Sequence, residues 1–278
     1  MKKRKWQHRR NAKVSVGARL GQHFLRGTWA ARTLVAAGKV SHGDVVLEIG
    51  PGKGVLTREI LATGARVIAI EKDETLIALL RKTFADEIHS RALTVVADDV
   101  RNILPENLDL KEADYTVAAN IPYYITGEII RQFLTARVQP KMMVLLVQKE
   151  VAQRIISKRG SILSISVKAY GTPKIVAKVP RGNFSPPPSV DSAILSVERI
   201  SRDFFKDIEE ESFFRFVRAG FSSKRKFLAG NLAEKCDLAR TAVLDAFSKC
   251  DIKEKARAED LSLEQWKCLV LKLAGTRY

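Results

Sequence analysis

The sequence has little cysteine and no long hydrophobic run. Cys236, Cys250 and Cys268 are odd in number, widely spaced and without a neighbouring histidine. This pattern predicts reduced, buried thiols in a cytosolic protein, with no disulfide framework and no metal site such as zinc. The longest clean apolar run, Met142 to Val147, is far too short to cross a bilayer. We therefore expect no membrane association.

Acidic residues are scarce relative to basic ones. Lys and Arg number 48 against 31 Asp and Glu, which gives a formal net charge of +17. Residues 1–19 hold eight of the basic side chains and no acidic one. Because no apolar segment follows, we expect a flexible basic arm on a cytoplasmic protein and no secretion signal. A basic surface of this size favours a polyanionic partner such as nucleic acid, bound with salt-dependent affinity.

Strand and helix signals alternate through residues 20–200. A chain that is 46% hydrophobic can bury a large core, and its 28% of charged residues does not indicate disorder. Alternation of this kind predicts an α/β fold with parallel βαβ units and helices on both faces of the sheet. The last two strands surround a proline-rich loop and predict an antiparallel finish. The seven expected strands are residues 44–49, 66–71, 93–97, 115–119, 142–147, 174–179 and 193–197.

The pattern changes to helical spacing from about residue 201. Phe213, Phe216 and Val217 illustrate this spacing, which recurs to the end of the chain. Ser262 and Gln265 have the spacing of a capping box at the start of the last helix. The sequence therefore predicts a small all-α domain over residues 201–278.

A glycine-rich segment follows the first strand of the alternating region. In Glu48-Ile-Gly50-Pro-Gly52-Lys-Gly54, the glycines allow a tight turn and a close approach to a ligand. Glu71 follows Gly50 by 21 residues, at the end of the next strand, where a carboxylate can accept both ribose hydroxyls of a nucleoside. This pattern fits an NAD enzyme and an S-adenosylmethionine enzyme. The carboxylate before the glycines and the lack of GxGxxG spacing favour the latter.

Two further segments follow the third and fourth strands. In Asp98-Asp99-Val100, a carboxylate can accept from an adenine amine, although either Asp could be a helix cap. Asn120-Ile-Pro122-Tyr123 can hold a nucleobase amine, because the Asn120 oxygen and a neighbouring carbonyl can accept its two N–H groups. Pro122 stiffens this turn, and Tyr123 offers a flat face to an extruded base. Together they indicate methyl transfer to an exocyclic amine.

These motifs in this order resemble the rRNA adenine dimethyltransferase family, most of all its bacterial small-subunit (16S) branch. The resemblance spans roughly Gly17 to Leu232. It implies a Rossmann-like class I methyltransferase fold, and N6-dimethylation of adenines in rRNA within a small ribosomal subunit or its precursor. The matching motifs are Gly21-Gln-His-Phe-Leu25, Glu48–Gly54, Glu71-Lys-Asp73, Asp99-Val100, Asn120–Tyr123, Gln148-Lys-Glu150, Phe184–Ser192 and Phe221-Ser-Ser-Lys-Arg-Lys226.

The resemblance also implies roles for individual residues. The residues implied to bind S-adenosylmethionine are Gln22, His23, Leu25, Gly50, Gly52, Glu71, Lys72, Asp99, Val100 and Asn120. The implied acceptor site consists of Asn120, Pro122, Tyr123 and Phe184, with Phe184 stacking on the other face of the base. Loss of Phe184 is therefore expected to harm base positioning more than folding. Lys224, Arg225 and Lys226 are implied to contact RNA phosphates, and the helical domain to dock on the ribosomal particle.

Two positions depart from the family pattern. His23 and Tyr124 stand where relatives usually carry Asn. Tyr124 leaves the choice between one and two methylations open. Three alternatives also stay open: methylation of 23S rRNA by an erythromycin-resistance type of enzyme, a non-catalytic RNA-binding assembly factor, and an NAD(P) dehydrogenase. The last lacks a recognisable acid or base for hydride transfer. Nothing in the sequence demands more than a monomer.

Overall fold

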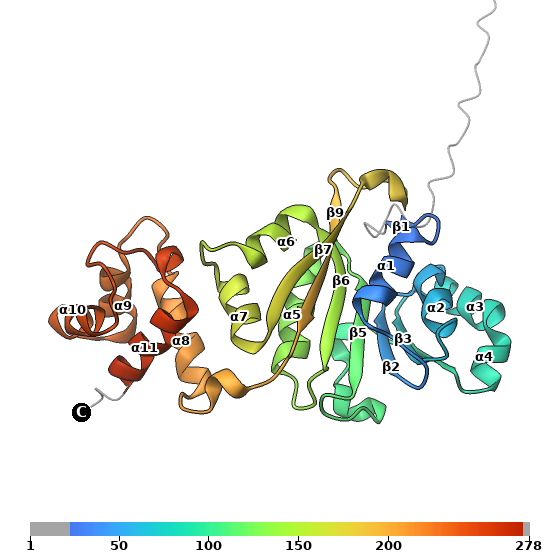
Figure 1. The fold of residues 1–278 in the computed structure, drawn as a ribbon, viewed down its shortest axis with the longest axis horizontal. Coiled ribbons are helices and arrows are strands. Elements are labelled where there is room, and N and C mark those ends of the chain that lie inside the picture. Colours follow the sequence, from blue (N-terminus) through green and yellow to red (C-terminus); the bar gives the residue numbers. More distant parts are fainter. Residues whose placement is uncertain (1–22, 275–278) are drawn as a thin grey trace, which may run out of the picture.

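A mixed sheet forms the centre of the protein, as the computed structural model shows for residues 23–274 (Figure 1). In this part of the chain, seven strands form the sheet in the order β4-β3-β2-β5-β6-β9-β7. Only β9 runs antiparallel to its neighbours, β6 and β7. The predicted α/β fold with its antiparallel finish is confirmed. The strands are β2 (Val45–Ile49), β3 (Arg66–Glu71), β4 (Leu93–Ala97), β5 (Tyr115–Asn120), β6 (Met142–Gln148), β7 (Thr172–Val179) and β9 (Ser192–Glu198).

Helices cover both faces of this sheet because its central strands are apolar on both sides. In β2, Val46 packs in one buried cluster with residues of α1, α2 and α3, while Leu47 packs in the other with residues of α5, α6 and α7. This two-sided burial is typical of parallel strands connected by helices. The helices are α1 (Trp29–Ala37), α2 (Val55–Leu61), α3 (Glu74–Thr83), α4 (Ala85–His89), α5 (Thr126–Thr135), α6 (Lys149–Ile156) and α7 (Ile162–Tyr170).

The strand order places a crevice at the carboxyl ends of β2 and β5. The chain moves outward from β2 to β3 and β4, then returns to start β5 on the other side of β2. β2 pairs in parallel with both neighbours, so Ile49 lies opposite Ile70 of β3 and Ala119 of β5. The loops that follow these strands therefore emerge at one edge. Ligands of open α/β sheets bind at such a reversal point.

A second, two-stranded sheet lies beside this crevice and was not predicted. β1 (Phe24–Leu25) pairs antiparallel with β8 (Phe184–Ser185), which comes from the loop between β7 and β9. Each strand has only two residues, too few for a periodic signal in the sequence. The pairing joins the start of the described chain to the far side of the sheet.

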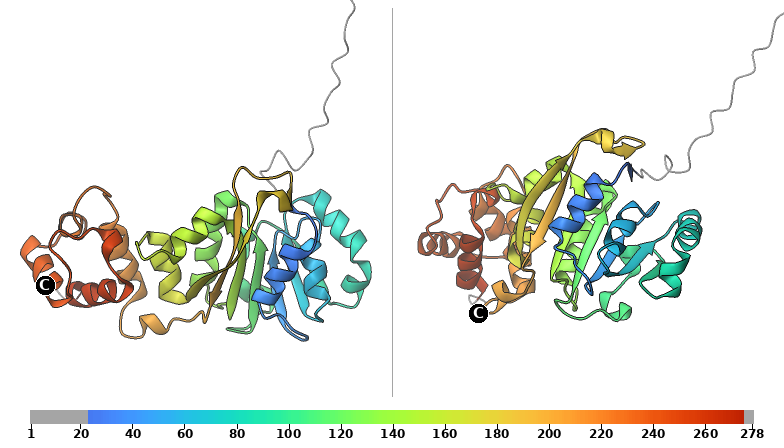
Figure 2. Two further views of the ribbon diagram at one scale, coloured as in Figure 1. Left: turned by 45° about the horizontal axis from the view of Figure 1, so that its top comes forward. Right: turned by 45° about the vertical axis from the view of Figure 1, so that its right-hand side comes forward.

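The last helices pack around a hydrophobic cluster of their own, next to α7 (Figure 2). Trp266, Phe213 and Phe247 are fully buried within it, and Ile165 and Ala169 of α7 complete its boundary. The predicted Ser262–Gln265 capping box is confirmed by its two reciprocal hydrogen bonds. No helix within residues 23–274 combines the length and the apolar character that crossing a membrane requires. These helices are α8 (Glu210–Gly220), α9 (Leu228–Cys236), α10 (Arg240–Lys249) and α11 (Leu263–Ala274).

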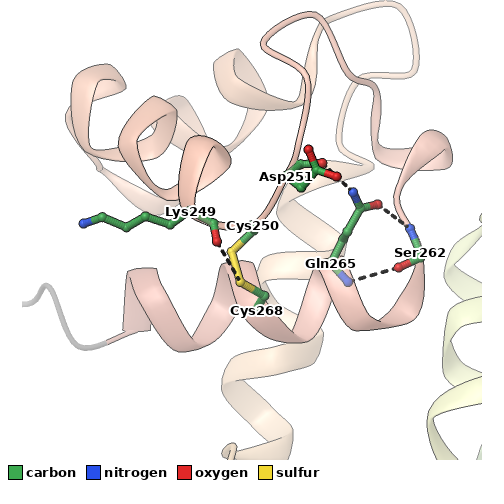
Figure 3. The surroundings of a disulfide bond; sticks show 6 residues. All are labelled: Lys249, Cys250, Asp251, Ser262, Gln265 and Cys268. Carbon is green, nitrogen blue, oxygen red and sulfur yellow. Dashed lines mark hydrogen bonds between the residues drawn. A yellow bond between two sulfur atoms is a disulfide. The ribbon is translucent and has the colours of Figure 1, made fainter.

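A disulfide in this helical part corrects the prediction of reduced cysteines. Cys250, just after α10, is bonded to Cys268 on α11 (Figure 3). The two residues are 18 positions apart in sequence. They meet because the chain reverses between α10 and α11, and α11 then packs against α10. Spacing alone does not reveal such a contact, because it depends on how the two helices pack.

Candidate active site

One pocket opens at the carboxyl edge of β2, β3, β4 and β5. Its walls come from the segment around β1 and from the loops that follow these strands. Eleven of the residues predicted to form the site line this pocket together. They are His23, Leu25, Gly50, Gly52, Glu71, Lys72, Asp99, Val100, Asn120, Pro122 and Tyr123.

The glycine-rich turn after β2 forms the floor of the pocket. Gly52 has a left-handed φ of +58°, and a Cβ atom there would lie 3.0 Å from the Phe24 ring. Gly54 has a φ of +78°, and its Cβ would lie 2.4 Å from the Phe84 ring. Both positions therefore require glycine, for conformation and for space. The Phe24 ring lies 5.1 Å from the Lys53 ammonium group and also lines the pocket. The residues of the glycine-rich turn line the pocket beside it.

The Glu71 carboxylate is held in place by main-chain amides. Its Oε1 accepts from the amides of Lys72 (2.9 Å) and Asp73 (3.1 Å), and its Oε2 accepts from the amide of Gly52 (3.2 Å). The side chain is only 5% exposed but lines the pocket. Since each carboxylate oxygen can accept more than one hydrogen bond, the fixed group can still receive hydroxyl donors from a ligand.

Glu48 is a second carboxyl group at the pocket, and it is fully buried. It is 1% exposed, and neither oxygen has a hydrogen-bond partner among the described residues. Burial raises its pKa to about 8, with a smaller contribution from Glu71. Thr57 partly offsets this rise, although its hydroxyl forms no hydrogen bond of standard geometry with the carboxyl group. A buried carboxyl without a partner, facing a pocket, is suited to receive a cationic or N–H donor from a ligand.

The raised pKa of Glu48 predicts how stability depends on pH. In the folded protein, Glu48 keeps its proton up to about pH 8, whereas in the unfolded chain it releases the proton near pH 4.5. Its free energy of unfolding should therefore fall as pH rises through this range, relative to the isosteric Glu48→Gln variant. Urea denaturation of both proteins across the range measures the difference. If the free energy of unfolding changed with pH in the same way for both proteins, Glu48 would not retain its proton in the folded state.

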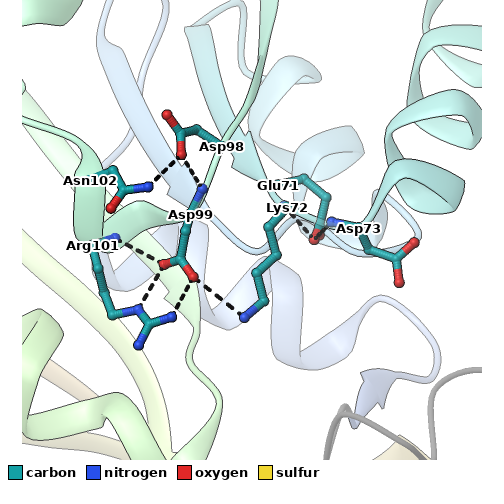
Figure 4. A network of polar contacts seen from close by, with 7 residues as sticks. All are labelled: Glu71, Lys72, Asp73, Asp98, Asp99, Arg101 and Asn102. Carbon is teal, nitrogen blue, oxygen red and sulfur yellow. Dashed lines mark hydrogen bonds and ion pairs between the residues drawn. The ribbon is translucent and has the colours of Figure 1, made fainter.

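A network of charged groups fixes Asp99 at the pocket (Figure 4). Arg101 donates to both carboxylate oxygens of Asp99, at 3.0 and 2.7 Å, and Lys72 lies 3.5 Å away. These hydrogen bonds with Arg101 hold the pKa of Asp99 well below its usual range, so the carboxylate stays charged. Asp98 also lines the pocket, but it accepts from the Asp99 amide and the Asn102 side chain and has no cation among these partners. Of the two aspartates left open by the sequence, Asp99 is the one oriented by cations.

The turn after β5 faces the same pocket. Asn120, at the end of β5, donates from its Nδ2 to the main-chain oxygen of His23 at 2.8 Å. This bond fixes the orientation of the amide, and its Oδ1 can still accept. Pro122 then leads into a short 3-10 helix, η4 (Tyr123–Ile125), where the Ile125 amide donates to the Pro122 oxygen. The turn therefore places an oriented acceptor on a stiff backbone.

Tyr123 and His23 form one wall of the pocket. Their ring centroids are 5.7 Å apart. The Tyr123 hydroxyl is hydrogen bonded to Ser192 at 2.7 Å, and burial raises its pKa. His23 Nδ1 donates to the Pro186 carbonyl at 2.9 Å, because a carbonyl oxygen can only accept. The His23 ring is thus fixed by the loop between β7 and β9, and the Tyr123 ring by the first residue of β9.

Some of the predicted residues do not join the pocket. Phe184 is 1% exposed, because β8 pairs with β1 and its ring packs into the core beside α1 and α2. The stacking role predicted for it is therefore not seen in this arrangement. Lys224, Arg225 and Lys226 are exposed in the turn between α8 and α9, and Lys226 forms an ion pair with Glu234 at 2.9 Å. Gln22 and the basic arm lie outside the described residues.

The pocket also includes residues that the site prediction lacked. Glu48 belongs to the glycine-rich motif, and its position at the end of an apolar strand was the signal for a buried carboxyl. Phe24 is next to two predicted residues, but no local pattern predicts its packing on Gly52. Tyr124 was noted only as a departure from the family pattern, and it lines the pocket mouth with 67% of its surface exposed.

Comparison with solved structures gives the same fold over nearly the whole chain. A dimethyladenosine transferase from Plasmodium falciparum is 27% identical, with a TM-score of 0.77 over 91% of this chain and 98% of the other. The 23S rRNA methyltransferase ErmE is 25% identical, with a TM-score of 0.72 over 90% of this chain and 99% of the other.

Sequence comparison identifies the family. Ribosomal RNA small subunit methyltransferase A of Dehalococcoides mccartyi is 40% identical over 258 residues, covering 92% of this chain and 88% of the relative. The protein of the same name from Moorella thermoacetica is 36% identical, with 88% of each chain covered. The sequence pattern of the ribosomal RNA adenine dimethylase family matches residues 15–274. The chain therefore belongs to the ribosomal RNA adenine dimethylase family.

Proposed function

We propose that this enzyme transfers methyl groups from S-adenosylmethionine to the N6 amine of adenines in small-subunit rRNA. The observation that carries the proposal is the position of the Asn120 turn, which opens into the same pocket as the glycine-rich turn and Glu71. An acceptor for an amine and a nucleoside-binding carboxylate thus share one cavity. The names of the curated relatives support the small-subunit target.

The residues of the pocket fit S-adenosylmethionine. Glu71 would accept the ribose hydroxyls, and Asp99 the adenine amine of the cofactor. The buried carboxyl group of Glu48, which lacks a partner within the described chain, would receive the ammonium group of the methionine part. Gly50 and Gly52 line the pocket with left-handed backbone, φ +66° and +58°, which glycine adopts without strain. When bound, the cofactor supplies an electrophilic methyl group on a positively charged sulfur.

The protein's part in the transfer is to orient the amine. Adenine N6 is a poor nucleophile because its lone pair is delocalised into the ring. Asn120 Oδ1 and a neighbouring main-chain carbonyl accept its two N–H groups, which directs the lone pair at the methyl carbon. Tyr123 provides a flat face for the flipped base. The methyl group would leave its sulfonium sulfur as it bonds to the nitrogen, which would release a proton afterwards, so the site would need no strong base.

The helical domain, residues 201–278, would dock the enzyme on the ribosomal particle. Lys224, Arg225 and Lys226 support this role, because they are exposed together in one turn (residues 222–227) at the far end of the molecule from α3 and α4. Clustered cations on an exposed turn can bind RNA phosphates, whose charge dominates such affinities.

Replacing Lys224, Arg225 and Lys226 by serine should weaken binding to undermethylated small subunits. Loss of three phosphate contacts should lower the slope of log affinity against log salt by roughly two. Equilibrium binding at several salt concentrations measures this slope. The matched control replaces Arg81, Lys82 and Arg91, three exposed cations near α3 and β4, and should keep the slope. Equal effects of both triple variants would contradict a specific role for the turn.

The proposed function is tested by incubating the protein with labelled S-adenosylmethionine and, in parallel reactions, undermethylated small subunits or large subunits. Nucleoside analysis should find the label in N6,N6-dimethyladenosine, and primer extension should stop at adenines of the small-subunit rRNA. Label in large-subunit rRNA instead would favour the erythromycin-resistance type of activity. Absence of methyl transfer to either subunit would contradict the proposed function and favour a non-catalytic RNA-binding assembly factor.

A further inference from the structure

The mouth of the pocket carries an aromatic ring that the proposed chemistry does not use. Tyr124 lines the pocket next to Tyr123, but the two residues differ in their surroundings. Tyr123 is partly buried and anchored to Ser192, whereas Tyr124 is 67% exposed. A tyrosine this exposed contributes little to the core, and its ring face remains available at the entrance.

A guanidinium group is bonded to another residue that lines the same pocket, Asp99. Arg101 uses one edge, Nε and one terminal nitrogen, to hold Asp99. Its other edge can still donate, and the side chain is 47% exposed. The bonds to Asp99 raise the pKa of Arg101, so the guanidinium group stays charged. The pocket therefore has an exposed aromatic ring in its lining and a charged, half-exposed guanidinium group bonded to another lining residue.

Both groups stand on supported backbone. Arg101 belongs to the short 3-10 helix η2 (Val100–Asn102), and Gln132 of α5 donates to the carbonyls on either side, Val100 at 2.7 Å and Ile103 at 2.8 Å. Tyr124 lies in η4, which continues directly into α5. Because the same helix fixes both segments, the spacing between the ring and the guanidinium is set before a ligand arrives, which lowers the entropic cost of binding.

We propose that Tyr124 and Arg101 form a subsite for the nucleotide next to the target adenosine. Its base stacks on the Tyr124 ring, and its phosphate binds the outer edge of Arg101. A flipped adenosine stays joined to its neighbours by phosphodiester bonds, so an adjacent nucleotide must lie at the pocket mouth. Stacking and phosphate binding together are typical of sites for single-stranded nucleic acid. This inference rests on the proposed function, since it assumes an RNA adenosine in the pocket.

The Tyr124→Leu and Tyr124→Phe variants test the stacking part. Leucine keeps apolar bulk without an aromatic face, whereas phenylalanine keeps the face. We expect Tyr124→Leu to raise KM for undermethylated small subunits by about ten-fold. The KM of Tyr124→Phe should stay close to that of the original protein. The affinity of each variant for S-adenosylmethionine, measured by calorimetry, should stay within a few-fold of the original. A KM for Tyr124→Leu equal to that of the original protein would overturn the subsite.

The Arg101→Gln variant tests the phosphate part. The slope of log affinity against log salt, for a labelled single-stranded RNA with a central adenosine, should fall by about 0.7. The binding is measured without S-adenosylmethionine, because Arg101 also orients Asp99 and its loss is expected to weaken cofactor binding. The matched control is Arg66→Gln, an exposed arginine at the opposite edge of the sheet, and it should leave the slope unchanged.

The outcomes separate this inference from the proposed function. If the original protein methylates rRNA but Tyr124→Leu and Arg101→Gln behave like it, the subsite alone is wrong. If Tyr124→Leu instead weakens cofactor binding as much as RNA binding, Tyr124 covers the cofactor and the subsite is again wrong. If no RNA is methylated, the RNA-binding measurements on both variants still decide whether the mouth of the pocket binds a nucleotide.

Discussion

The Asn120→Ala variant should lose methyl transfer almost completely while still binding S-adenosylmethionine. Asn120 Oδ1 accepts from the amine most strongly as the nitrogen becomes tetrahedral, so its loss acts on the transition state. Removal of one such oriented group typically lowers kcat by about 100- to 1000-fold. Single-turnover transfer of labelled methyl groups to undermethylated small subunits measures the rate, and calorimetry measures cofactor affinity, which should change by no more than a few-fold.

A suitable control for this experiment is Asn107→Ala. Asn107 is exposed on η3 (Pro105–Leu108) and does not line the pocket, so its truncation should leave kcat near that of the original protein. Near-normal turnover of Asn120→Ala would refute its assignment as the amine acceptor. A loss of cofactor affinity as large as the loss of rate would show that Asn120 acts through the cofactor, by way of its bond to the His23 carbonyl.

The Phe184→Ala variant should lose stability, by about 3–5 kcal/mol. The ring is 1% exposed and belongs to the cluster that packs α1 and α2 on the sheet. Its truncation leaves a cavity, and it also loosens β8 and hence β1, whose Leu25 pairs with Phe184. Urea denaturation measures the effect. This expectation reverses the one from the sequence, in which base positioning suffers more than folding.

The exposed Val190, in the same loop before β9, provides the control. Val190→Ala should change stability by no more than about 0.5 kcal/mol, since the side chain is 43% exposed. If Phe184→Ala were as stable as Val190→Ala and yet had a raised KM for its RNA substrate, then Phe184 would leave the core when RNA binds. The stacking role implied by the family resemblance would then hold.

The sequence predicted the sheet because each strand carried its own apolar signal. The two helices between β6 and β7, α6 and α7, and the short β1–β8 pair were not predicted. Two-residue strands have no period to detect, and their pairing depends on the return of a distant loop. The disulfide between Cys250 and Cys268 was missed for the same reason, because it depends on the packing of α11 against α10.

The sequence placed the candidate site residues that follow the strands in one region, and they line one pocket. Gly50, Glu71, Asp99 and Asn120 all come directly after or at the end of a parallel strand, and topology alone brings such positions to one edge. The orientation of each side chain could not be predicted from the sequence. The choice of Asp99 over Asp98 depends on Arg101 and Lys72, and the burial of Phe184 depends on β1.

The pocket is expected to direct a sulfonium methyl group at the turn that begins with Asn120. A crystal structure of the protein with S-adenosylhomocysteine and adenosine tests it most directly. We expect the ribose of the cofactor product on Glu71, its sulfur facing the turn, and the N6 amine of the adenosine between Asn120 Oδ1 and a main-chain carbonyl. A sulfur atom directed away from Asn120, or adenosine bound with its amine outside the turn, would contradict the account.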